Sequence, residues 1–161
     1  MTGPTPEIAD ALRSTDEALA RLDKVLSGLS DGDLHLAHHD GGWTPAQLVS
    51  HINVSVLLWT ATLARVQHDP ELTFVFREEI GHDALGYPPP RIELARRQLD
   101  STRRTLRTCV PALDPAVLGR EVTIPDLGTL TIGAWTPPVL GHAAGHADQA
   151  LDVLRDRGAL Q

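Results

Sequence analysis

Residues 43–51 of the chain read WTPAQLVSH, and this stretch contains the most distinct helix start in the sequence. Thr44 is a suitable N-cap, Pro45 fits the first helical turn, and Gln47 stands where a capping box needs Glu or Gln. Apolar side chains then recur at helical spacing as far as the histidine and proline near residue 70. The stretch therefore predicts a long helix over residues 44–67 with one buried face.

Three further stretches show the same periodicity. An apolar stripe made mostly of leucines predicts a helix over residues 6–28, and a stripe opposed by arginines predicts one over residues 90–110. A fourth helix is expected over residues 136–156, because a proline near its start suits a first turn. Four long helices predict an all-α fold, a four-helix bundle that forms a single domain over residues 1–161.

Two connections are longer than a simple bundle needs. The first, residues 69–90, contains a strand-like run at Leu72–Phe76, and the second, residues 118–135, includes a segment over 121–133 that is typical of a short β-hairpin. Long loops in a compact domain usually carry function or their own structure. We therefore expect both connections to wall a pocket at one end of the bundle.

The composition excludes several classes of protein. A formal net charge of −7 without a basic stripe argues against a nucleic-acid partner. The single cysteine, Cys109, allows no internal disulfide and is typical of a reducing compartment. The N-terminus has no signal-peptide pattern, and no apolar run approaches the ~20 residues that span a bilayer. We expect a cytoplasmic protein that acts on a small-molecule substrate, with no membrane partner; a homodimer stays open.

Three histidines fall on apolar helix faces. His142 and His146 stand four residues apart on the fourth predicted helix, so their imidazoles point the same way. His51 lies on the apolar side of the second predicted helix. Taken singly, His51 is typical of a hydrogen-bonded core histidine, and the pair lacks the glutamate of an HExxH motif.

Taken together, three buried imidazoles without carboxylate partners are costly unless they share a metal ion. Three nitrogen ligands with open positions are the pattern of a catalytic metal site and not of a closed structural one. Imidazole suits zinc, nickel, iron or copper, and we expect zinc or nickel. The sequence therefore predicts a divalent metal held by His51, His142 and His146.

The motif WTPAQLVSH at 43–51 and the later pattern His142-x-x-x-His146-x-x-Gln149 resemble the DinB/YfiT-like superfamily. The resemblance implies a four-helix bundle with a three-histidine metal site at the same three residues, and a role for Gln149 in packing or in support of a ligand. The family includes S-transferases that use bacillithiol or mycothiol, and mycothiol-dependent maleylpyruvate isomerases. In the isomerase branch the first residue of the late pair is typically glutamate, whereas this chain has His142.

Several other side chains are candidates for the pocket. In addition to Gln149, these candidates are Ser55, Trp59, Arg77, Tyr87 and Trp135. Trp59 and Trp135 fit a core position at least as well as a pocket wall. Trp43 is expected to pack the entrance of the second helix, and His38 and His39 in the loop before it are expected to be exposed.

The function that the resemblance and the histidines favour is a metal-dependent thiol S-transferase, in which the ion activates a thiolate or polarises the electrophile. One lysine beside thirteen arginines is typical of a high-GC bacterial genome, which favours mycothiol as the low-molecular-weight thiol and co-substrate. A metal-dependent hydrolase, cyclase or isomerase that uses no thiol is the first alternative. A non-catalytic metal-binding stress protein is the second, because a fold alone does not determine a reaction.

Overall fold

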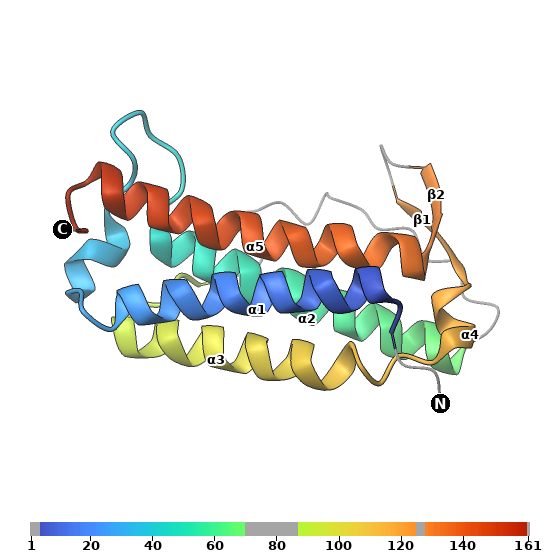
Figure 1. Ribbon diagram of the computed structural model, residues 1–161. Helices are drawn as coiled ribbons and strands as arrows, with labels where there is room; N and C mark the ends of the chain where they lie inside the picture. The colour runs from blue at the N-terminus through green and yellow to red at the C-terminus, as the bar shows by residue number, and fades with distance from the viewer. Residues whose placement is uncertain (1–3, 70–86, 125–127, 161) are drawn as a thin grey trace.

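The computed structural model describes residues 4–69, 87–124 and 128–160. Four long helices lie side by side and confirm the predicted four-helix bundle (Figure 1). They are α1 Pro6–Leu26, α2 Pro45–His68, α3 Ile92–Cys109 and α5 Ile132–Asp156. Each helix contributes a fully buried aliphatic side chain to one shared core, for example Leu19, Ile52, Leu99 and Leu140.

The helices do not simply alternate in direction. Figure 1 shows α1 and α5 running one way along the bundle and α2 and α3 running the other way. Both α1 and α2 pack against α3 and α5, so that α2 and α5 are antiparallel neighbours. The end of α2 and the start of α3 therefore lie at opposite ends of the bundle, which accounts for the long connection between them. The strand-like run predicted at Leu72–Phe76 lies outside the described residues.

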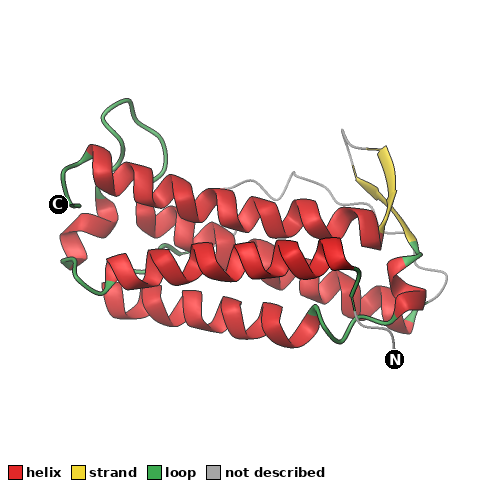
Figure 2. Cartoon of the chain, in the orientation of Figure 1, coloured by secondary structure: helices red, strands yellow, loops and turns green. Residues whose placement is uncertain are grey.

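The short elements lie at the two ends of the bundle (Figure 2). A 3₁₀ helix, η1 Asp31–His35, follows α1, and a short helix, α4 Pro115–Leu118, follows α3. Strands β1 Glu121–Ile124 and β2 Gly128–Thr131 pair antiparallel, with Val122 opposite Leu130. The predicted hairpin over 121–133 is therefore confirmed.

The last helix begins one turn earlier than predicted, at Ile132, so Pro137 lies inside it and not at its start. The Thr131 hydroxyl accepts the backbone N–H of Ala134 at 3.1 Å and supplies the N-cap. A Cβ at Gly133 would lie only 3.1 Å from the carbonyl oxygen of Leu118, so the end of α4 packs directly on this first turn. This packing and the N-cap outweigh the cost of the backbone hydrogen bond that Pro137 cannot donate. For this reason the helix does not begin at the proline, as the sequence predicted.

Helix α2 is the one described helix that is long and apolar enough, by length and composition, to cross a membrane. Half of its most apolar stretch is buried inside the bundle, where Ile52, Val56 and Leu63 contact the core. Core helices of soluble proteins share this length and composition. The composition of α2 is therefore weak evidence for a membrane span.

Ion pairs join α1 to α3 on the far side of the bundle from α2. Arg103 donates to both carboxylate oxygens of Asp16, at 3.0 and 3.3 Å, and Arg107 donates to the same carboxylate at 2.6 Å. Burial by itself raises the pKa of Asp16, but the hydrogen bonds from Arg103 and Arg107 outweigh it and hold the pKa below its ordinary value. Folding therefore favours the ionised form of Asp16.

Replacing Asp16 by Asn should lower the free energy of unfolding at pH 7 by about 1–2 kcal/mol, because two arginines lose a shared, half-buried acceptor. The pKa of Asp16 is lower in the folded protein than in the unfolded chain. Its contribution to the free energy of unfolding is therefore complete above about pH 4 and is lost as the pH falls through the pKa of the folded protein. Urea unfolding of wild type and Asp16→Asn between pH 7 and pH 3 measures it. Asp10→Asn, in an exposed pair with Arg13, is the control and should change little. A stability difference that does not narrow in acid would contradict this account.

Candidate metal centre

His51 lies in the second turn of α2, and the start of that helix is fixed by the predicted capping box. The Gln47 N–H donates to the Thr44 hydroxyl at 3.3 Å, and the Thr44 N–H donates to the Gln47 amide oxygen at 2.9 Å. With the start fixed, the helical repeat turns His51 toward α5 and leaves its side chain half-buried. A local motif therefore sets the direction of this ligand.

His142 and His146 lie one turn apart near the middle of α5, and their ring centroids are 4.4 Å apart. His146 is half-buried, but His142 is exposed and not buried as its place on an apolar face predicted. The ring of His51 is 5.1 Å from that of His142 and 4.7 Å from that of His146. One ligand nitrogen from each of the three residues lies within 4.8 Å of the other two. The structure thus brings together the three histidines that the sequence selected, although 91 positions separate His51 from His142.

The geometry of this cluster fits a divalent metal ion. Nitrogens that bind one ion at about 2.0–2.1 Å, at angles between about 90° and 109°, lie about 2.9–3.4 Å apart. The Nε2 atoms of His51 and His142 are 2.9 Å apart, within that range. Among the described residues, the group contains no carboxylate and no thiol. All three candidate ligands in this group are therefore imidazole nitrogens, a donor type that suits zinc, nickel, iron or copper.

Gln149 fixes the protonation of one ligand. Its side-chain oxygen lies 2.9 Å from Nδ1 of His146. Because an amide oxygen can only accept, Nδ1 of His146 carries the proton, and Nε2 presents its lone pair toward the cluster. Support of this kind orients a metal-binding histidine and raises its basicity. Gln149 therefore lies next to a candidate ligand and holds it in the tautomer that can bind an ion.

Trp43 is part of the site, although the sequence suggested only a role in packing the start of α2. Its ring lies 4.9 Å from that of His51, edge to face, and 5.8 Å from that of His146, nearly parallel to it. Trp43 thus contacts ligands from two different helices and restrains both imidazoles. The only signal in the sequence for this role is the position of Trp43, directly before the N-cap and eight residues before His51, which is about two helical turns.

Two exposed positions of α5 next to the ligands carry no side chain. Gly141 and Gly145 are both exposed, and a Cβ built on either would meet no described atom within 4 Å. A glycine inside a helix costs about 1 kcal/mol relative to alanine, and no internal contact among the described residues requires either one. At these two positions, therefore, no side chain of α5 itself stands between the ligands and the helix surface.

The remaining predicted pocket residues are dispersed. Ser55 is half-buried one turn after His51, while Trp59 and Trp135 are buried in the core. Tyr87 does not wall the site, because 96% of its surface is exposed at the chain segment that leads into α3. Arg77 lies outside the described residues.

The hairpin does not wall the ligands either, contrary to the expectation for residues 118–135. It lies beside the first turn of α5, whereas His142 is ten residues further along that helix, or about 15 Å at 1.5 Å per residue (Figure 1). The ligands lie instead toward the end of the bundle where α2 begins and α5 finishes. Among the described loops, the one before α2 reaches them, because it carries Trp43.

Wild-type protein purified without chelators, or reconstituted with zinc or nickel, should hold about one equivalent of metal, and His142→Ala should lose most of it, because two imidazoles bind far more weakly than three. Elemental analysis after gel filtration measures the occupancy. His68→Ala, at the exposed end of α2, is the matched control and should retain the ion. Full occupancy in His51→Ala would remove His51 from the site.

Comparison with known proteins agrees with this architecture. The structure is similar to that of YfiT from Bacillus subtilis, which is described as a probable metal-dependent hydrolase with an unusual four-helix bundle topology. The TM-score is 0.73 at 16% sequence identity, over 98% of this chain and 91% of that chain, so the two proteins share the fold. A search of curated protein sequences gave no significant match. The sequence pattern that defines the DinB superfamily matches residues 14–150, which is most of the chain. The chain therefore belongs to the DinB superfamily.

Proposed function

We propose that the protein is a metal-dependent enzyme acting on a small molecule, with His51, His142 and His146 as the metal ligands. One observation carries the proposal: three neutral imidazoles from two helices converge within 4.8 Å, and no described carboxylate joins them. Three neutral ligands leave the double positive charge of a divalent ion uncompensated. Such a site favours an anionic fourth ligand, as a catalytic site does and a closed structural site does not.

A divalent ion held there would supply Lewis-acid chemistry, by which it lowers the pKa of a thiol or water that it binds and polarises a carbonyl group. The residues of the chain supply the rest. Gln149 keeps His146 in the binding tautomer, and Trp43 covers one side of His51 and His146. Gly141 and Gly145 place no side chain of α5 where a substrate would approach the ligands along that helix.

Within this class we favour transfer to a low-molecular-weight thiol of the mycothiol type, with zinc or nickel as the metal. The thiol would lose its S–H proton to solvent, its sulfur would form a bond to an electrophilic carbon, and the bond between that carbon and the leaving group would break, its electron pair departing with the leaving group. A thiolate is an anionic ligand that matches zinc well, and the three imidazole ligands themselves carry no negative charge. Membership of the DinB superfamily is compatible with this chemistry.

Hydrolysis of a small metabolite without a thiol is the second candidate. It is supported by the description of YfiT, which shares this fold, as a probable metal-dependent hydrolase. Cyclisation or isomerisation would use the same site, and a non-catalytic metal-binding stress protein would use the site without turnover. In each case we expect a cytoplasmic protein with a small-molecule partner and neither nucleic acid nor a membrane; a homodimer is compatible with all of them.

Thiol dependence separates the candidates. The metal-loaded protein should conjugate mycothiol to monochlorobimane, at a rate that rises with thiol concentration and falls to the uncatalysed rate after chelation. His142→Ala should be inactive, and His68→Ala should match wild type. The fluorescence of the bimane conjugate gives the rate. Turnover of ester or amide substrates at a rate unchanged by thiol would favour the hydrolase, and no turnover of either kind would favour the non-catalytic protein.

Gly145→Ala should stabilise the protein and impair turnover at the same time. Alanine gains about 1 kcal/mol of helix propensity, and its Cβ meets no described atom, so the melting temperature should rise. The same methyl group narrows the approach to the ligands, so kcat/KM should fall about tenfold while the affinity for zinc is unchanged. Ser101→Ala, on the exposed face of α3, is the control and should stabilise without loss of turnover. Equal turnover in Gly145→Ala would show that the substrate approaches from another side.

A further inference from the structure

The loop between η1 and α2 is tied to the last residue of α5. In Figure 1 this loop lies beside the C-terminal end of α5. The backbone N–H of His39 and its ring Nδ1 both contact the Asp156 oxygen Oδ2, at 2.9 and 2.6 Å. His38 Nε2 lies 3.3 Å from the other oxygen, Oδ1. One carboxylate therefore receives three contacts from two consecutive residues, 117 positions earlier in the sequence.

The ring protons are arranged to serve this carboxylate. The Asp40 backbone N–H donates to Nδ1 of His38 at 3.1 Å, so Nε2 of His38 carries the proton that faces Asp156. The hydrogen bond from the His39 backbone, together with the neighbouring histidine side chains, holds the pKa of Asp156 below its ordinary value. Asp156 is thus an ionised acceptor at neutral pH, and it is the centre of the clasp, defined as His38, His39 and Asp156.

A tight turn joins the clasp to Trp43. The Gly41 N–H donates to the His38 carbonyl at 2.8 Å, and Gly41 and Gly42 have φ values of +90° and +99°. Such values strain any residue other than glycine, so these two positions allow the chain to turn within three residues of His39. Beyond Trp43 the capping box of α2 begins at once. Trp43 is therefore held between two fixed points, the clasp on one side and the start of α2 on the other.

Trp43 is the residue that connects the clasp to the candidate metal ligands. Its ring is edge to face with His51 on α2 and stacked on His146 on α5. Binding one ion requires both imidazoles to stay in a single orientation, and immobilising a free side chain costs free energy that a preorganised one does not. Any displacement of Trp43 would release both rings together.

We propose that Asp156 is a positioning residue that acts at a distance: through His38 and His39 it fastens the loop that presses Trp43 onto His51 and His146, and so it sets the affinity of the site for its metal. Asp156 lies ten residues after His146, about 15 Å along α5, and is not itself a ligand. The proposal rests on the three-histidine metal site of the proposed function, and it adds a residue to that site that makes no contact with the ion.

The test compares Asp156→Asn with Asp152→Asn. Asparagine has nearly the same shape but replaces one acceptor oxygen by a donor, so it cannot accept from both His38 and His39. Asp152 lies one turn earlier and pairs only with the exposed Arg155 among the described residues, so its replacement leaves the loop untouched. Titration with zinc against a chromogenic chelator should give a dissociation constant about threefold to tenfold higher for Asp156→Asn, a smaller loss than removal of a direct partner of a ligand. Asp152→Asn should match wild type.

A second measurement separates the clasp from a general loss of stability. The indole ¹H–¹⁵N signal of Trp43, assigned from its absence in Trp43→Phe, should shift or broaden in metal-free Asp156→Asn, while the signals of the buried Trp59 and Trp135 should not. Trp43→Ala should weaken zinc binding by itself, and adding Asp156→Asn to it should cause no further loss. Additive losses in the double variant, or an unchanged zinc affinity and Trp43 signal in Asp156→Asn, would overturn the proposal.

The same experiments distinguish failure of the clasp from failure of the site. Wild-type protein that binds neither zinc nor nickel would disprove the metal site, and with it the function proposed above. The indole signals in the metal-free protein would still report whether Asp156 positions Trp43. Zinc binding that is normal in wild type and equal in Asp156→Asn would leave the site intact and remove Asp156 from it.

Discussion

The antiparallel contact between the start of α2 and the middle of α5 is the interaction on which the candidate site depends. Neither helix alone presents more than two imidazoles, and two do not hold an ion well. The contact places His51 next to His142 and His146, with two Nε2 atoms 2.9 Å apart. The apolar core fixes how the two helices approach each other, and the cluster lies at the edge of that core, with His51 and His146 half-buried and His142 exposed. Core packing and the geometry of the ligands therefore cannot vary independently.

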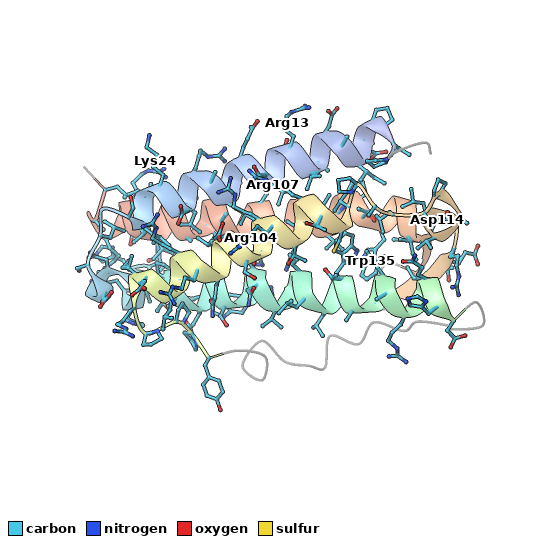
Figure 3. All side chains as sticks on the ribbon, turned by 90° about the horizontal axis from the view of Figure 1, so that it is seen from below. Arg13, Lys24, Arg104, Arg107, Asp114 and Trp135 are labelled. Carbon is cyan, nitrogen blue, oxygen red and sulfur yellow. The ribbon has the colours of Figure 1, made fainter. Side chains whose placement is uncertain are left out.

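The order of helix directions decides which parts of the chain surround this contact. Because α1 and α5 run opposite to α2 and α3, the loop that follows η1 and the last turn of α5 share one end of the bundle (Figure 1). The hairpin β1–β2 is carried to the other end. Figure 3, viewed from below, shows Trp135 and Asp114 toward that other end, away from Lys24. Side chains at the end of the bundle where α2 begins can therefore contact the ligands. Trp43 is one of them, because its ring packs against His51 and His146.

The sequence by itself determined the features that depend on residues close together along the chain. The period of the apolar residues predicted all four long helices, since a helix buries one face at a spacing of 3.6 residues. The capping box of Thr44 and Gln47 predicted where α2 begins, because both hydrogen bonds lie within four residues. The pair of His142 and His146 was predictable because residues one turn apart share a face. His51 was predicted as a metal ligand because it lies on an apolar helix face. Its pairing with His142 and His146 was inferred only from the ability of imidazoles to share a metal ion.

Only the tertiary structure decided which distant residues meet. The role of Trp43 follows from a contact with His146 across two helices, and no local pattern specifies such a contact. The clasp of His39 on Asp156 joins positions 117 residues apart, so the loop histidines looked merely exposed in the sequence. The early start of α5 at Ile132 depends on the packing of Gly133 against α4, which overrides the preference of proline for a first turn. Local preferences are worth about 1 kcal/mol or less per residue, and long-range packing outweighs them wherever the two disagree.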